Sequence, residues 1–297
     1  MMEALDLGMI HSVMVSVAYE AGSIMLLERP SQSESDIKKN SADIVTETDK
    51  AVEKLVSSKL LSAYPDFQFI GEETYYSGQK LTDKPTFIVD PIDGTTSFVH
   101  NFPAFCISIG LAVKKTPVVG VIYNPLLDEL YAAIQGQGAY LKRGSSSDKQ
   151  KLPLRKAEPL NDLSKCLIGI EWGSDRTGIN YELKNNVFTK LAASKEDGGA
   201  MVRGLRNIGS TALNLASVAA GQQDIFWDGG CWAWDVCAGW CILVESGGMV
   251  VSGNPGEWEC EVESRKYLAV RGAPSGQRQI IDEFWKVIGD GRLEYSS

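Results

Sequence analysis

Apolar residues recur at helical spacing in several stretches of this chain, and these stretches predict its helices. Residues 4–28 have this pattern and predict a first helix. A second helix is predicted to end near Tyr64, because apolar residues before it recur at i, i+3, i+4 and i+8: Val52, Leu55, Val56 and Leu60. We expect three more helices, at 180–194, at 211–220 and at about 235–245, the last ending at glycines 247 and 248.

Short apolar runs of strand length occupy much of the remaining chain. They lie at residues 67–70, 86–89, 104–113, 117–123, 130–134, 139–141 and 166–172. Two polar stretches predict loops, at 31–41 and 144–151. We expect a single domain over 1–297, with a subdomain boundary near 144–151 as the best candidate division.

The overall charge of the chain is acidic, with 29 Lys and Arg against 38 Asp and Glu over 297 residues, a formal net charge of −9. This balance argues against a general nucleic-acid or membrane-surface partner, because phosphate backbones and anionic lipids attract basic surfaces. There is no run of about 18 apolar residues, the length that a transmembrane helix needs. The start of the chain lacks the basic region of a signal peptide, and the six cysteines form no C-x-x-C pair. We therefore expect free thiols and a cytoplasmic location.

Histidine is scarce, and this restricts the chemistry. His11 and His100 are the only two in the sequence, so a Ser-His-Asp triad or a histidine-rich zinc site would have to use one of them. A structural role is the simpler expectation for both. Catalysis is therefore expected to depend on carboxylates.

An apolar run that ends in two acids is the main candidate for such chemistry. Residues 87–89 deliver Asp90 at the end of the predicted strand, Asp93 follows three residues later, and Gly94-Thr95-Thr96 can open a turn or a helix. Mg²⁺ prefers oxygen ligands, and amides at a helix N-terminus bind anions, so this pattern suits a cation and a phosphate. The alternative is a hairpin turn at Asp93-Gly94, but the segment is too long for a two-residue turn.

Acids also occur in two segments that come earlier in the chain. Glu72 and Glu73 follow another apolar run, and one of them could face a metal ion, although a solvated loop is the better interpretation of this segment alone. Asp49 precedes a helical pattern and is expected to cap that helix, unless Thr46 or Thr48 does so and leaves Asp49 for the site.

Tryptophan and acids are concentrated in one later stretch of the chain. Four of the seven tryptophans fall between residues 227 and 240, beside Asp228 and Asp235. The simple interpretation is an aromatic core cluster with Asp235 at a helix start, and the functional one is a pocket for a sugar-like or cyclitol ligand. The hydroxyl-rich segment 206–212 is either a helix cap or a contact to a polar substrate.

Taken together, three motifs carry a resemblance that covers nearly the whole chain. The sequence resembles the inositol monophosphatase family in Gly-Glu-Glu at 71–73, Asp-Pro-Ile-Asp-Gly-Thr-Thr at 90–96 and Trp-Asp-Val-Cys-Ala-Gly at 234–239. The resemblance implies an α+β fold, an alternating αβαβα layered sandwich of the sugar phosphatase type. It further implies Mg²⁺-dependent hydrolysis of a phosphate monoester, usually myo-inositol 1-phosphate. Two to three Mg²⁺ ions per site, inhibition by lithium and a homodimer are also expected from it.

The resemblance also assigns roles to individual residues. It places metal ions on Glu72, Asp90, the Ile92 carbonyl, Asp93 and Asp235. Catalysis would use Glu72 and Thr95 to orient the attacking water, with Asp49 bound to Thr95. Substrate contacts would come from Ile92, Asp93, Gly94, Thr95, Gly209, Ser210, Thr211, Asp228 and Asp235, and supporting roles from Lys38 and Glu73.

One position departs from the family pattern. Residue 228 is Asp where the animal enzymes usually carry a longer Glu that contacts the inositol hydroxyls, so the choice of alcohol is open. Alternative substrates are histidinol phosphate, 3′-phosphoadenosine 5′-phosphate and fructose 1,6-bisphosphate, although Ala238-Gly239 favours the inositol branch. The alternative to an enzyme is a non-catalytic relative that binds a polyol phosphate.

Overall fold

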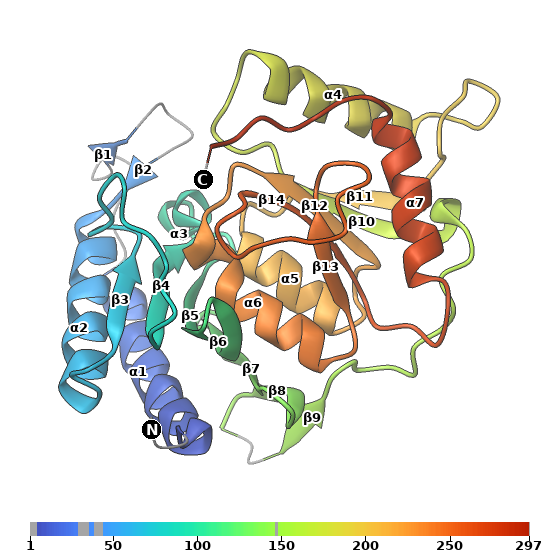
Figure 1. The fold of residues 1–297 in the computed structure, drawn as a ribbon. Helices are drawn as coiled ribbons and strands as arrows, with labels where there is room; N and C mark the ends of the chain where they lie inside the picture. Colours follow the sequence, from blue (N-terminus) through green and yellow to red (C-terminus); the bar gives the residue numbers. More distant parts are fainter. Residues whose placement is uncertain (1–4, 29–35, 39–43, 146–147, 297) are drawn as a thin grey trace.

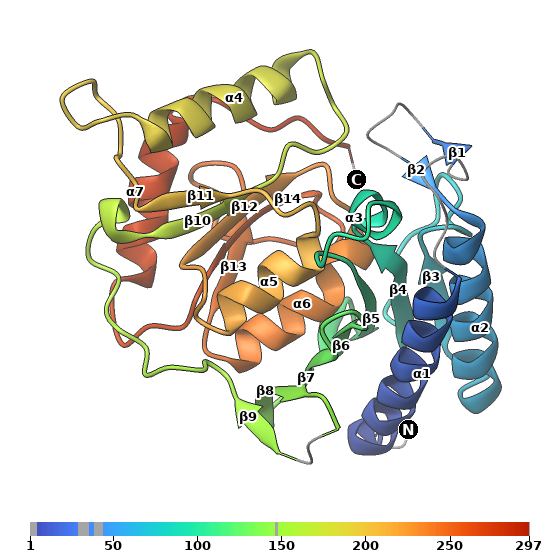
Figure 2. The same cartoon turned by 180° about the vertical axis from the view of Figure 1, so that it is seen from behind.

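The computed structural model describes residues 5–28, 36–38, 44–145 and 148–296, which fold into alternating layers of helices and sheets (Figures 1 and 2). A seven-stranded and a five-stranded sheet each lie between two helix pairs. From one outer face to the other these pairs are α1 (Leu7–Leu27) with α2 (Glu47–Ala63), α5 (Thr211–Ala219) with α6 (Ala233–Glu245), and α4 (Ile179–Ala192) with α7 (Gln277–Ile288). The expected αβαβα layered α+β fold is confirmed.

The first sheet follows the chain in simple order. Its strands are β3 (Gln68–Gly71), β4 (Thr86–Asp93), β5 (Cys106–Val113), β6 (Thr116–Asn124), β7 (Glu129–Ile134), β8 (Gly138–Arg143) and β9 (Lys149–Lys151). Every neighbouring pair is antiparallel except β3 and β4. All eight residues of β4 are buried, because helices cover both faces of this sheet.

The second sheet has crossovers, and its strand order is β11-β10-β12-β14-β13. Its strands are β10 (Leu167–Ile170), β11 (Gly204–Arg206), β12 (Ile225–Gly229), β13 (Met249–Ser252) and β14 (Lys266–Val270). β10 runs parallel to both β11 and β12, while β14 is antiparallel to its neighbours β12 and β13. Three short elements lie outside the two large sheets: β1 (Asp36–Ile37) paired with β2 (Ile44–Val45), helix α3 (Thr95–Val99), and a 3₁₀ turn at Leu163–Lys165.

Two predicted loops differ from the structure. Residues 149–151 form β9, which pairs with β8 and extends the first sheet, so the polar stretch 144–151 is not wholly a loop. Residues 36–37 form β1, and most of the remaining predicted loop 31–41 lies outside the described residues. Polar composition was misleading in both cases because these are exposed edge strands, which need no apolar face.

Helix α1 begins at Asp6, whose carboxylate accepts a hydrogen bond from the Met9 amide at 2.9 Å. Among the described residues, this one helix is long and apolar enough to cross a membrane. Eight of its residues are nevertheless buried, six of them in a hydrophobic cluster shared with α2 and the first sheet. Such burial is typical of a core helix.

Helix α6 lies unusually close to the first sheet. A Cβ atom added to Gly120 of β6 would lie 2.2 Å from the carbonyl oxygen of Ala238, and one added to Gly110 of β5 would lie 2.5 Å from Cys237 Sγ. Gly110 and Gly120 are direct partners across the two strands. The pair therefore forms a smooth strip that lets the backbone of α6 approach the sheet.

Candidate active site

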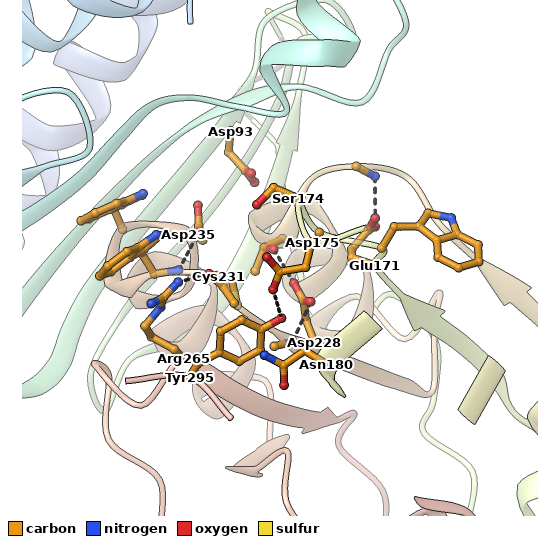
Figure 3. Close-up of a pocket in the computed structure, with 18 of the residues that line it drawn as sticks. Asp93, Glu171, Ser174, Asp175, Asn180, Asp228, Cys231, Asp235, Arg265 and Tyr295 are labelled. Atoms are coloured by element: carbon orange, nitrogen blue, oxygen red, sulfur yellow. Dashed lines mark hydrogen bonds between the residues drawn. The ribbon is translucent and has the colours of Figure 1, made fainter. Parts of the chain in front are cut away.

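Three buried or partly buried carboxylates from two elements meet beside a large cavity. Asp90 and Asp93 lie at the end of β4, where the pairing with β5 shifts register between them, and Asp235 lies in the first turn of α6. One oxygen from each carboxylate lies within 4.8 Å of the other two. Figure 3 shows Asp93 and Asp235 pointing into the cavity. Such a set of oxygen donors suits a hard divalent cation.

The protonation of these acids reflects their crowding. Burial, followed by the charges of the neighbouring carboxylates, raises the pKa of Asp90 and of Asp235 well above the usual range. Burial also raises the pKa of Asp93 to about 6, although hydrogen bonds from Ser210 and Ala212 oppose the rise. Like charges gathered out of water destabilise the protein until protons or a cation neutralise them.

Glu72 and Glu73 lie next to this cluster and are held by a lysine. Lys38 Nζ lies 2.9 Å from Glu72 Oε1 and 2.6 Å from Glu73 Oε1. Burial raises the pKa of Glu72 to about 7 although Lys38 lowers it, and the two carboxylates raise the pKa of Lys38 although burial opposes this. The Glu72 side chain is 24% exposed and lines the cavity, so this turn forms part of the cavity wall.

Asp49 serves a helix start and the site at once. Thr46 is the N-cap of α2, and Asp49 Oδ2 accepts hydrogen bonds from the Thr46 amide at 2.9 Å and its hydroxyl at 2.5 Å. The other oxygen, Oδ1, lies 3.2 Å from Thr95 Oγ1, which also lies 3.1 Å from the Ile92 carbonyl. Thr46, and not Asp49, is therefore the N-cap, while Asp49 completes a capping box and contacts Thr95 with its other oxygen. Burial raises the pKa of Asp49 to about 6.

The segment after Asp93 is a helix start and not a hairpin. Gly94 has a φ of 91°, and α3 begins at the next residue, so the hairpin interpretation is wrong. A Cβ at Gly94 would lie 2.5 Å from the Ala104 carbonyl oxygen, which leaves room for glycine alone. The amides of the first turn of α3 have no partners within the helix and are available to an anion.

The start of α5 completes the wall around Asp93. Ser210 is the N-cap of α5, and its hydroxyl donates to Asp93 Oδ2 at 2.6 Å. The Ala212 amide donates to the same oxygen at 2.7 Å. The helix-cap interpretation of the hydroxyl-rich segment is therefore confirmed, and its contact to a polar substrate stays a prediction. Gly209 and Thr211 line the cavity itself.

Asp228 lies at the end of β12 and has a partner that the sequence did not reveal. Lys184 of α4 is 2% exposed, and its Nζ lies 3.0 Å from Asp228 Oδ1 and 2.6 Å from the Gly229 carbonyl oxygen. The Thr211 hydroxyl donates to Asp228 Oδ2 at 3.2 Å. Asp228 still lines the cavity, but protein groups already bind both of its oxygens.

Glu171 is an acid of the cavity wall that the sequence did not single out. It follows β10, lines the cavity and accepts from the Ile208 and Gly209 amides at 2.9 and 3.0 Å. Burial raises its pKa to about 7. The signal that singled out Asp90, an apolar run ending in an acid, is also present here and could have identified Glu171.

The cavity has a volume of about 740 Å³, within the range of small-molecule sites. The tryptophan-rich stretch divides between core and cavity. Trp227 is fully buried against Phe284, whereas Trp232 and Trp234 stack at 5.1 Å and line the cavity. The aromatic-core and pocket-wall interpretations are therefore each correct for part of the run.

Comparison with known proteins agrees with this geometry. The sequence pattern of the inositol monophosphatase family matches residues 6–288. Inositol monophosphatase 1 of Saccharomyces cerevisiae is 46% identical over 98% of this chain and 99% of its own length, and inositol monophosphatase 2 of the same yeast is 47% identical over 88% and 87%. The solved structure of the inositol monophosphatase from Anabaena matches with a TM-score of 0.74 and 28% identity over 97% of this chain and 98% of that one. The chain therefore belongs to the inositol monophosphatase family and is a phosphatase.

Proposed function

We propose that this protein catalyses the Mg²⁺-dependent hydrolysis of a small phosphate monoester, with myo-inositol 1-phosphate as the preferred substrate. The observation that carries the proposal is the cluster of Asp90, Asp93 and Asp235 beside the cavity, with every carboxyl pKa raised. Family membership supports the reaction class, and the names of the yeast relatives support the substrate.

The donor set of this site fits Mg²⁺. Carboxylates and a backbone carbonyl are the oxygen ligands that this ion prefers, and no histidine or cysteine thiolate is needed. We assign two to three ions to Glu72, Asp90, the Ile92 carbonyl, Asp93 and Asp235. Bound Mg²⁺ supplies positive charge that makes water a better nucleophile and offsets the charge of the phosphate.

The residues around this cluster orient the reactants. Glu72 and Thr95 hold the attacking water, and Asp49 positions the Thr95 hydroxyl through the contact at 3.2 Å. The amides of Gly94 and Thr95 bind the phosphate, because they lie at the start of α3. Lys38 and Glu73 support Glu72 by fixing the position of its carboxylate.

The alcohol part of the substrate binds in the remainder of the cavity. Ile92 and Asp93 lie at the phosphate side, and the groups proposed for the hydroxyls are Gly209, Ser210, Thr211, Asp228 and Asp235. A related structure from Staphylococcus aureus, with a TM-score of 0.69 and 27% identity over 93% of each chain, is described as bound to inositol monophosphate, which supports a cyclitol ligand. Because the bond from Lys184 fixes the Asp228 side chain, we assign Asp228 to the rigid wall of the cavity, from which it contacts the substrate hydroxyls without moving.

The remaining assignments follow the family. We propose a cytoplasmic homodimer that is inhibited by lithium and has neither nucleic-acid nor membrane partners. We also propose a single phosphatase domain over 1–297. Its subdomain boundary is expected near 144–151, but the first sheet ends with β9 at residue 151 and the second begins with β10 at 167, which favours a division between 151 and 167.

Phosphate release with Mg²⁺ tests the proposal on four substrates: inositol 1-phosphate, histidinol phosphate, fructose 1,6-bisphosphate and 3′-phosphoadenosine 5′-phosphate. Preference for inositol 1-phosphate would support it, and preference for another ester would overturn the substrate while keeping the reaction. Asp93→Asn and Asp235→Asn should each leave a folded protein with turnover reduced at least about 100-fold. Asp66→Asn, at an exposed position, is the control. Near wild-type turnover in either site variant would refute the metal assignment.

A further inference from the structure

The end of residues 290–296, which we call the closing segment, lines the cavity although this segment lies past the part of the chain that matches the family pattern. That match ends at residue 288, where α7 also ends. The chain then turns back from α7 and ends close to the two-stranded β1–β2 sheet and α3, as both ribbon views show (Figures 1 and 2). Glu294, Tyr295 and Ser296 line the same cavity as Asp93 and Asp235.

Two asparagines from other parts of the fold hold the closing segment in place. Asn254 accepts from the Leu293 amide at 2.7 Å and donates to the Leu293 carbonyl at 3.2 Å. Asn180 makes the same pair of bonds with Glu294, at 2.8 and 2.9 Å. Leu293 is 2% exposed and belongs to the core beneath the second sheet. The segment is thus fixed as a neighbouring strand would fix it, by paired amide and carbonyl bonds.

This anchoring fixes Tyr295 against a wall made of glycine. A Cβ atom on Gly229 would lie 2.9 Å from the Tyr295 ring and one on Gly230 would lie 3.0 Å from it, so larger residues there would displace the ring. The Tyr295 hydroxyl donates to Asp175 Oδ2 at 3.1 Å (Figure 3). Because Gly229 directly follows Asp228, the ring lies next to the position at which the sequence departs from the family.

Arg265 links Tyr295 to the aromatic residues near the metal cluster. Its guanidinium lies 3.6 Å from the centre of the Trp232 ring and 5.3 Å from that of Tyr295. It also donates to the Ser296 carbonyl at 3.2 Å and the Gly230 carbonyl at 2.9 Å. The Trp232 amide in turn donates to Asp235 Oδ2. A continuous wall therefore runs from the closing segment to the acids.

We infer that the closing segment forms the part of the cavity that recognises the alcohol of the substrate, and that Tyr295 selects for ring-shaped polyols. This inference rests on the proposed function. The Tyr295 ring, which lines the cavity, offers flat apolar surface to the C–H groups of a cyclitol, while the surrounding donors and acceptors match its hydroxyls. A compact, open-chain alcohol presents too little surface to use this wall.

The test compares KM and kcat for inositol 1-phosphate with those for glycerol 2-phosphate. Tyr295→Ala should raise KM for inositol 1-phosphate by about tenfold with little change in kcat, because binding that is equal in ground and transition states affects KM alone. KM for glycerol 2-phosphate should change by less than about twofold. If the alanine variant unfolds, Tyr295→Leu replaces it, because leucine keeps apolar contact with the glycines. Tyr295→Leu should likewise raise KM for inositol 1-phosphate and leave KM for glycerol 2-phosphate nearly unchanged. Tyr295→Phe keeps the ring and should remain close to wild type.

Arg292→Ala is the matched control, because Arg292 belongs to the closing segment but, among the described residues, bonds to the Gly289 and Gly291 carbonyls alone and is not part of the cavity lining. An equal change for both substrates, a fall in kcat, or no change at all would overturn the inference and reduce the closing segment to a structural support. Failure of the wild-type enzyme to release phosphate from any ester with Mg²⁺ would instead remove the proposed function, and the inference with it.

Discussion

The close approach of α6 to the first sheet gives a sharp prediction for Gly120→Ala. The new methyl group would point at the backbone of α6 and meet the Ala238 carbonyl oxygen at 2.2 Å, whereas ordinary contact begins near 3.4 Å. A backbone carbonyl in the middle of a helix cannot rotate away, so the helix or the strand has to move by about 1 Å. The substitution is therefore an overpacking of the core.

The expected loss has two parts. Overpacking of this kind costs about 1–3 kcal/mol in the free energy of unfolding. The same displacement moves Asp235, which lies one turn before Ala238 on α6, away from Asp90 and Asp93 on β4. Because a misplacement of about 1 Å in a reacting group can cost about 100-fold in rate, turnover should fall more than stability alone would explain.

Urea unfolding measures the loss in the free energy of unfolding, and a Mg²⁺ titration of phosphate release measures the fall in turnover. The control is Gly204→Ala, at a strand glycine where a Cβ meets only the ends of the Leu167 and Arg206 side chains, at 3.2 and 3.4 Å. Wild-type stability together with a wild-type Mg²⁺ dependence in Gly120→Ala would refute the reasoning, because it would show that this contact does not fix α6.

Two further predictions concern buried charge. Lys184→Met should lower the free energy of unfolding by about 3–5 kcal/mol, because it leaves Asp228 buried without its cation, and adding Asp228→Asn should restore most of the loss in a urea-unfolding double-mutant cycle. Equal losses in the single and double variants would contradict this explanation. Without Mg²⁺ the protein should lose stability as the pH rises from about 4 to about 7, because burial raises the pKa of Asp93 to about 6 and of Glu72 to about 7, so the folded state binds more protons than the unfolded state in that range. The increase in Tm produced by Mg²⁺ should therefore be larger at pH 8 than at pH 5, and an equal increase at both would count against a cation at these acids.

The sequence predicted the elements whose pattern is complete within a short window. β4 is buried on all eight positions, so its apolar run and the acids that end it were visible together. Helix α7 was missed although its buried residues repeat at helical spacing: Ile280, Ile281, Phe284, Trp285 and Ile288. Strands β12, β13 and β14 were also missed, and their order in the sheet depends on crossovers that no local pattern shows.

The site was predictable as a set of residue types but not as a set of partners. Lys184 lies on a helix with mixed polarity, and only the packing of α4 beside the end of β12 shows that it meets Asp228. Tyr295 gave no signal at all, since no motif surrounds it. The contacts of Lys184 with Asp228 and of Tyr295 with Asp175 join segments more than 40 residues apart, and local sequence patterns do not encode such contacts.

Asp49 and Asp235 occupy the same position, the third residue of a helix, and each binds the backbone amide of its own helix cap, that of Thr46 or Trp232. The carboxylates proposed for catalysis are thus also the ones that prevent two helices from fraying. A change of charge at either residue therefore alters its bond to the backbone amide as well as its proposed role in the site. A new metal preference in this scaffold would accordingly be constrained by folding, since only a side chain that keeps an acceptor oxygen at these two positions, as asparagine does, also keeps the bond to the helix cap.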